Sequence, residues 1–77
     1  MARNVTGKRY AVCIRNRGHR ASLVVRRLYE LLPDQEAEEH GLLRIVDESG
    51  EDYLYPAQMF VALELPRPVQ RAIAGAR

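Results

Sequence analysis

The stretch that decides the fold of this chain is Ile45-Val46-Asp47-Glu48-Ser49-Gly50-Glu51-Asp52-Tyr53-Leu54-Tyr55. β-Branched and aromatic residues flank a polar turn that contains Ser49-Gly50, which is the pattern of a β-hairpin. An isolated hairpin is at best marginally stable in water, so this one needs partner strands from the rest of the chain. The stretch therefore predicts a sheet built around its centre.

Working outward, three further segments are expected to be strands. Residues 9–15 alternate so that Tyr10, Val12 and Ile14 share one face, and residues 60–63 form a short apolar run. The segment 23–32 fits two patterns: its leucines and Val24 match a helical stripe, whereas Tyr29-Glu30-Leu31 alternates as a strand does. Because the hairpin needs partners, the strand is the favoured interpretation.

Two short helices are expected between and after these strands. Residues 34–40 form a helical turn, since Asp34 can cap its N-terminus and Gly41 can supply a left-handed residue at its end. Pro68 suits the first turn of a C-terminal helix that would dock on the body through Val69, Ala72 and Ile73.

Size and composition limit the classes of function. A chain of 77 residues makes one domain, with the sheet at about 9–64 and a basic C-terminal extension at 65–77. No apolar run reaches the ~20 residues that span a bilayer, and the N-terminus leads into no hydrophobic signal region. The expectation is a cytoplasmic protein with no membrane association.

Charge is strongly segregated along the chain. Residues 1–27 contain no carboxylate, residues 28–64 contain all ten acidic residues, and the C-terminal extension is basic again. The basic residues are Arg3, Lys8, Arg9, Arg15, Arg17, Arg20, Arg26 and Arg27 in the first part and Arg67, Arg71 and Arg77 in the last. Such segregation can create a basic face for polyanions, or it can mean that basic and acidic strands neutralise each other.

The order of these elements resembles that of SH3-like barrels. The shared features are a long polar first loop, a second strand with Tyr29, the tight Asp-Glu-Ser-Gly hairpin, and Tyr55-Pro56 followed by Phe60-Val61. More narrowly, the Cys13-Ile14 strand and the Asp47-x-x-Gly50-Glu51-x-Tyr53 hairpin are similar to a group of small bacterial and phage proteins of that fold. The resemblance implies an all-β, five-stranded SH3-like barrel with a 3₁₀ turn at residues 56–59.

In SH3 domains a peptide groove lies between the first long loop and the loop after the second strand. The matching loops here are residues 16–22 and 33–41, so the resemblance implies a protein-binding groove between them. Its candidate residues are Arg17, His19, Arg20, Glu36, Glu39 and Tyr55. A competing interpretation is that the opposite charges form solvated ion pairs worth about 0–1 kcal/mol each and close the cleft. Proline-rich peptides are less expected because the chain has no Trp.

The alternative function is nucleic-acid binding by the Arg-rich segment 15–27. Binding a polyanion needs several cations on one surface, together with planar groups that stack on bases. The candidate residues are Arg15, Arg17, Arg20, Arg26 and Arg27.

Neither enzymatic activity nor a cofactor is expected. Cys13 lies in the middle of a predicted strand, where a free cysteine is usually a small buried hydrophobic residue rather than a nucleophile. His19 and His40 fall in different loops, so no metal site is predicted. The chain is expected to be a monomer or a weak homodimer, with Leu65, Val69 and Ile73 as a possible seam.

Overall fold

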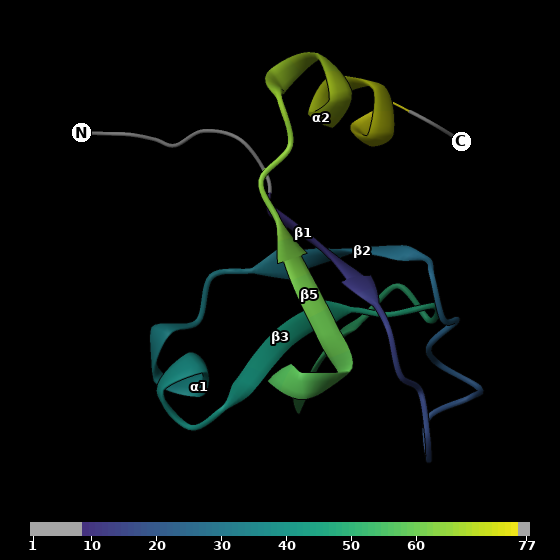
Figure 1. Ribbon diagram of the computed structural model, residues 1–77, viewed down its shortest axis with the longest axis vertical. Helices are drawn as coiled ribbons and strands as arrows, with labels where there is room; N and C mark the ends of the chain where they lie inside the picture. Colours follow the sequence, from purple (N-terminus) through teal and green to yellow (C-terminus); the bar gives the residue numbers. More distant parts are fainter. Residues whose placement is uncertain (1–8, 76–77) are drawn as a thin grey trace.

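The computed structural model describes residues 9–75, so Arg3, Lys8 and Arg77 of the basic segments lie outside the described residues. It contains five antiparallel strands, two short α-helices and one 3₁₀ helix (Figure 1). The elements are β1 (Arg9–Cys13), β2 (Leu28–Leu32), α1 (Gln35–Glu39), β3 (Leu42–Val46), β4 (Asp52–Pro56), η1 (Ala57–Met59), β5 (Phe60–Leu63) and α2 (Arg67–Ala74). The mostly β architecture that the sequence predicts is confirmed.

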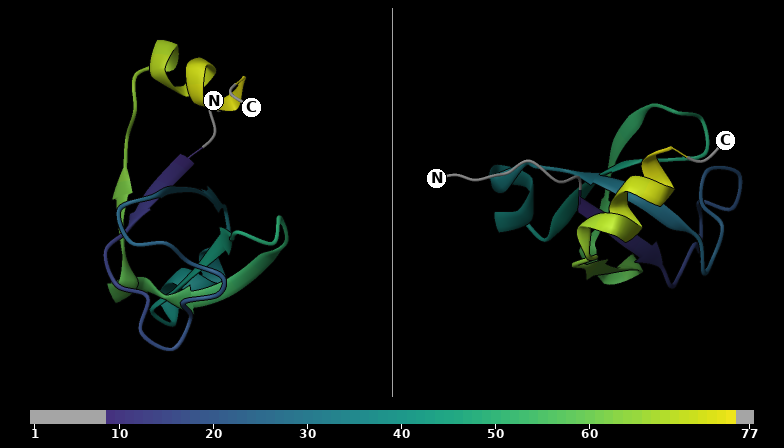
Figure 2. Two further views of the ribbon diagram at one scale, coloured as in Figure 1. Left: turned by 90° about the vertical axis from the view of Figure 1, so that its right-hand side faces the viewer. Right: turned by 90° about the horizontal axis from the view of Figure 1, so that it is seen from above.

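The strands form one sheet in the order β4-β3-β2-β1-β5, and the sheet curves around a single core (Figure 2). Strands β4 and β5 are its two edges, so the sheet is open and a closed barrel is not confirmed. The core contains residues from β1, β2, β3 and β4, together with Leu23, Met59 and Phe60.

The hairpin at the centre of the chain forms as predicted. Ile45 pairs with Tyr53, and Val46 pairs with Asp52. Gly50 has a φ of +86°, a left-handed conformation that glycine adopts at no steric cost. Its N–H donates to the Asp47 carbonyl, which closes the turn.

The prediction of a strand over residues 23–32 is only half right, since the strand begins at Leu28. The preceding residues form turns in which Leu23 is buried while Val24 is exposed. Arg26 has a φ of +73°, and its N–H donates to the Cys13 carbonyl. This left-handed residue ends any extended run before β2. Among the apolar residues of this turn, Leu23 contacts the core, and the others do not continue it as a strand.

The face of β1 that enters the core is not the one that carries Val12 and Ile14. Ala11 and Cys13 are fully buried in the core, whereas Ile14 is 41% exposed. Tyr10 is buried, but it is not a member of the core cluster. On the core face of β1, Ala11 pairs with Tyr29 and Cys13 pairs with Phe60. Small side chains fit on this face because the large rings of the neighbouring strands fill the space above them.

Helix α1 forms where it was predicted. The Asp34 carboxylate accepts a hydrogen bond from the Ala37 N–H at 3.0 Å, which caps the helix, and Gly41 has a φ of +76°. Asp34 also accepts from Arg44 of β3 at 2.8 Å. These contacts lower the pKa of Asp34, with the helix cap the larger cause and the guanidinium the smaller.

Helix α2 also forms, but it does not dock on the sheet in the way that was expected. It lies beyond the ends of β1 and β5 (Figures 1 and 2), and Val69 and Ala72 are exposed while Ile73 is half-buried. The extended Pro66 at its N-terminus leads the chain away from β5.

Candidate binding surface on the basic loop

The connection between β1 and β2, residues 14–27, is called the basic loop below. It contains five of the predicted site residues, Arg15, Arg17, Arg20, Arg26 and Arg27, and all five are exposed. It contains no carboxylate. Like-charged side chains on one long loop repel each other, so the loop needs anchors elsewhere in the molecule to hold one conformation.

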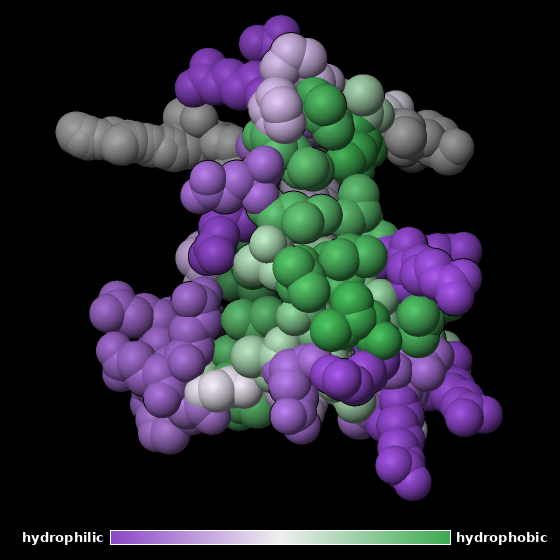
Figure 3. All heavy atoms as spheres, in the orientation of Figure 1, coloured by the Kyte–Doolittle hydropathy of each residue, from purple (hydrophilic) through white to green (hydrophobic). Residues whose placement is uncertain are grey.

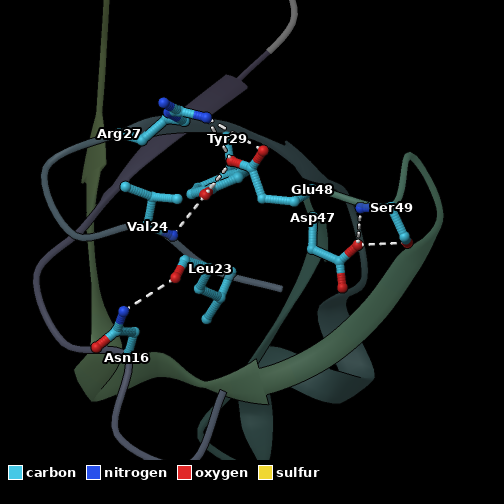
Figure 4. A network of polar contacts seen from close by, with 8 residues as sticks. All are labelled: Asn16, Leu23, Val24, Arg27, Tyr29, Asp47, Glu48 and Ser49. Carbon is cyan, nitrogen blue, oxygen red and sulfur yellow. Dashed lines mark hydrogen bonds and ion pairs between the residues drawn. The ribbon is translucent and has the colours of Figure 1, made fainter. Parts of the chain in front are cut away.

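The first anchor is packing and backbone pairing. Leu23 is fully buried in the core, and the Asn16 side-chain amide donates to the Leu23 carbonyl at 2.9 Å (Figure 4). The Glu48 N–H of the hairpin donates to the Ser22 carbonyl at 3.0 Å. The middle of the basic loop is therefore fixed to both the core and the β3–β4 hairpin.

The second anchor is a polar chain around Tyr29. Its hydroxyl accepts from the Val24 N–H at 2.7 Å and donates to the Glu48 carboxylate at 2.5 Å (Figure 4). Arg27 contacts the same carboxylate at 3.0 Å. The hydrogen bond from Tyr29, followed by that from Arg27, lowers the pKa of Glu48. Burial, and then the neighbouring carboxylate, raises the pKa of Tyr29 to about 12.

The third anchor joins the hairpin turn to β4 and to His19. The buried Asp47 carboxylate accepts from the Ser49 N–H at 2.9 Å, from the Ser49 hydroxyl at 2.6 Å and from the Tyr55 hydroxyl at 2.6 Å. Burial opposes ionisation of Asp47, but these hydrogen bonds outweigh it and lower the pKa. The ring of His19 packs edge-on against Tyr55, with 5.1 Å between the ring centroids. Of the predicted groove residues, the structure therefore brings His19 and Tyr55 together.

The arginines of the loop differ in how far their charge is compensated. Arg27 is paired with Glu48, and Arg15 donates to the Gln58 carbonyl at 3.2 Å. Within residues 9–75, no ion pair involves Arg17, Arg20 or Arg26. These three carry the uncompensated positive charge of the surface.

The acidic residues of the other predicted loop lie elsewhere. The basic loop leads into β2, whereas helix α1, which contains Glu36 and Glu39, follows it, so the two lie at opposite ends of that strand (Figure 1). The ion pairs of residues 33–41 are made with strands: Arg9 contacts Glu38 at 3.6 Å, and Arg44 contacts Asp34 at 2.8 Å. Glu36 and Glu39 are exposed, and the Glu39 carboxylate accepts from Gln35 of the same helix. The structure does not bring them to Arg17 and Arg20.

Sequence reasoning missed the apolar part of this surface. Ile14, Val24 and Val25 are 41%, 39% and 37% exposed, and all three belong to the basic loop. They were expected in strands, because a run of β-branched residues usually indicates one. The sequence did contain a signal for a loop. Val24-Val25 lies between Gly18 and the pair Arg26-Arg27, and these flanking residues favour a surface loop.

The remaining candidates have structural roles. Cys13 is buried as expected; burial raises the pKa of its thiol, which donates to the Arg15 carbonyl at 3.1 Å. His40 caps the end of α1, with Nδ1 2.8 Å from the Glu36 carbonyl. Across residues 9–75, no three His, Cys, Asp or Glu side chains gather where they could hold a metal ion.

Among the described helices, none has the length and apolar character needed to cross a membrane. Comparison of the chain with protein-family models, with curated proteins and with solved structures found no match in any of the three.

Proposed function

We propose that this protein is a non-enzymatic interaction module that binds an acidic protein segment through the basic loop. The single observation that carries the proposal is the uncompensated charge of Arg17, Arg20 and Arg26 on a loop with three anchors. An anchored loop loses little conformational freedom on binding, so more of the interaction energy appears as affinity.

The strand order supports an SH3-like architecture for the module. Strands β1 to β4 follow one another in the sheet, β5 pairs with β1, and a 3₁₀ turn joins β4 to β5. We propose that the open sheet is a variant of that barrel, in which the first long loop keeps its role as a binding element.

The composition of the surface favours a protein partner. The exposed side chains of Ile14, Val24 and Val25 lie in the same loop as the arginines, and burying apolar area contributes roughly 25 cal/mol per Å². A partner with acidic residues beside apolar ones would satisfy both kinds of group. The positive charge would steer its approach, and the apolar contacts would hold it in place.

Nucleic acid is a second candidate, favoured by one observation: the whole segment 9–27 lacks a carboxylate. Against it, His19 is the single aromatic ring in residues 14–27, and it is already packed against Tyr55 rather than free to stack on bases.

The test is a titration of ¹⁵N-labelled protein, followed by amide-resolved NMR, with two probes. One is a synthetic peptide of alternating Glu and Leu residues, and the other is a mixed-sequence oligonucleotide, single- or double-stranded. We expect the peptide to shift amides of residues 14–27, and Arg17→Gln with Arg20→Gln to weaken binding about tenfold.

The matched control is Arg67→Gln with Arg71→Gln, which removes the same charge from α2 and should weaken binding much less. Shifts with the oligonucleotide alone, fading as salt rises, would replace the protein partner with nucleic acid. Equal losses in the two double variants, or no shift in residues 14–27 with either probe, would overturn the proposal.

A further inference from the structure

The two edges of the sheet differ in how they are protected. Natural proteins guard an exposed edge strand with charged residues or proline, because unpaired backbone groups can pair with another chain. Strand β4 has Asp52 at one end, paired with Arg44 at 2.9 Å, and Pro56 at the other. Strand β5, Phe60-Val61-Ala62-Leu63, has neither a charge nor a proline, and nothing in the described sheet pairs with its outer edge.

An apolar row runs across the sheet beside this edge. Val61 pairs with Val12, and Val12 pairs with Leu28, so the three side chains share the face that points away from the core. Val61 is 45% exposed and Leu28 is 37% exposed. Figure 3 shows hydrophobic side chains gathered over β5 and β1 and continuing toward α2, where Val69 is 42% exposed.

We infer that β5 is a self-association edge, at which a second copy of this chain adds its own β5 antiparallel across a two-fold axis. The strand is self-complementary: a pairing centred on Ala62 sets Val61 of each copy against Leu63 of the other, with no charged residue inside either strand. A two-fold contact of this kind closes on itself and gives a dimer rather than a fibre. The apolar rows of the two copies then adjoin in one continuous sheet.

Charge complementarity at the ends of the strand supports a second copy of this chain as the partner. Glu64 follows β5 directly, and the same pairing sets it opposite Phe60 of the second copy. Arg15 lies at that end of β5, because its guanidinium donates to the carbonyl of Gln58 in η1. Each Glu64 carboxylate therefore comes close to an Arg15 guanidinium of the other copy, and the symmetry repeats the pair.

The first test is the molar mass of the full chain, measured by sedimentation over a range of protein concentrations. We expect a monomer–dimer equilibrium. Val61→Lys, on the outer face of β5, should weaken the dimer about tenfold, because the symmetry inserts the charge into the contact twice. The matched control is Leu54→Lys, on the guarded edge strand β4 at a similar exposure of 42%, and it should leave the equilibrium unchanged.

A charge exchange tests the orientation of the dimer. Glu64→Arg and Arg15→Glu should each weaken it, and the two together should restore it. A wild-type chain that stays monomeric at the highest concentration overturns the inference, whatever the folding of the variants. Two further results would also overturn the inference, because they would assign the contact to another surface. One is a dimer that is disrupted by Leu54→Lys but not by Val61→Lys. The other is a charge exchange that fails to restore association.

Discussion

The buried Asp47 carboxylate shows how one residue can organise both a turn and a loop. It takes hydrogen bonds from Ser49 within the turn and from Tyr55 on β4, and Tyr55 in turn supports His19 of the basic loop. Asp47 as a residue is only 6% exposed, and its buried carboxylate is tolerated because all of these donors are preorganised around it. Its contribution is therefore expected to be large for a turn residue.

We predict that Asp47→Asn lowers the free energy of unfolding by about 1–2 kcal/mol, because the amide cannot accept from both Ser49 and Tyr55 as the carboxylate does. The measurement is urea denaturation followed by circular dichroism. Asp52→Asn serves as the control: Asp52 is exposed and its ion pair with Arg44 is a surface contact, so the midpoint should barely move. Equal effects for the two variants would contradict the central role of Asp47.

At the residue scale, the sequence predicts which residues form the turn better than it predicts their long-range contacts. Asp47 and Ser49 were expected to favour a tight turn, and they do so. The hydrogen bonds from Tyr55 to Asp47 and from Tyr29 to Glu48 join residues 8 and 19 positions apart, and no local pattern specifies them. For the same reason alternation in β1 could not show that Ala11 and Cys13, rather than Val12 and Ile14, face the core.

At the scale of elements, glycines at positive φ lie in three of the connections: Gly18, Gly41 and Gly50. Gly50 has a φ of +86° and open space around its Cβ position, so only backbone conformation resists a side chain there. We predict that Gly50→Ala costs about 1 kcal/mol of stability, the usual cost of a left-handed conformation for a residue with a Cβ.

The matched control is Gly75→Ala at the end of α2. Gly75 has a φ of −88°, and a Cβ there would lie 3.4 Å from the Arg71 carbonyl oxygen, so the substitution should be close to neutral. Thermal unfolding of the two variants measures the difference directly. A larger loss for Gly75→Ala than for Gly50→Ala would show that packing, not backbone conformation, controls these positions.

Elements with strong local signals were predictable, and those that depend on long-range contacts were not. The β3–β4 hairpin, α1 and β5 lie where turn residues, a helix cap and apolar runs place them. The segment 23–27 failed because its apolar residues are divided between the core, where Leu23 lies, and the surface, where Val24 and Val25 lie. The position of α2 also failed, since nothing local shows whether an amphipathic helix meets its own sheet.

At the scale of the whole molecule, two of the three anchors of the basic loop contain ionisable groups: Tyr29 with Glu48 in one, and Asp47 with Tyr55 in the other. Asp47 and Glu48 have lowered pKa values, whereas Tyr29 and Tyr55 have raised ones. The contacts that hold the proposed functional surface need ionised carboxylates and neutral tyrosine hydroxyls. Both conditions are met together only over a limited pH range.

The last prediction is the shape of the stability curve against pH. Carboxylates with lowered pKa values stabilise the fold fully above their unfolded values near 4, and this contribution is lost as the pH falls through the folded values. Tyr29 behaves in the opposite sense: its contribution is complete below the unfolded value near 10 and is lost as the pH rises toward about 12. We therefore expect a plateau between about pH 5 and 9, with a loss on the order of 2 kcal/mol on the alkaline side.

Urea midpoints measured from pH 3 to pH 11.5, at a protein concentration low enough to avoid association, give the curve. Tyr29→Phe is the informative variant, because it removes the titrating hydroxyl and leaves the ring in place against Phe60, 6.4 Å away between centroids. It should be less stable than the wild type on the plateau and lose less stability above pH 10, since one titrating group is gone. An alkaline loss of the same size in both proteins would mean that Tyr29 does not hold the basic loop through Glu48.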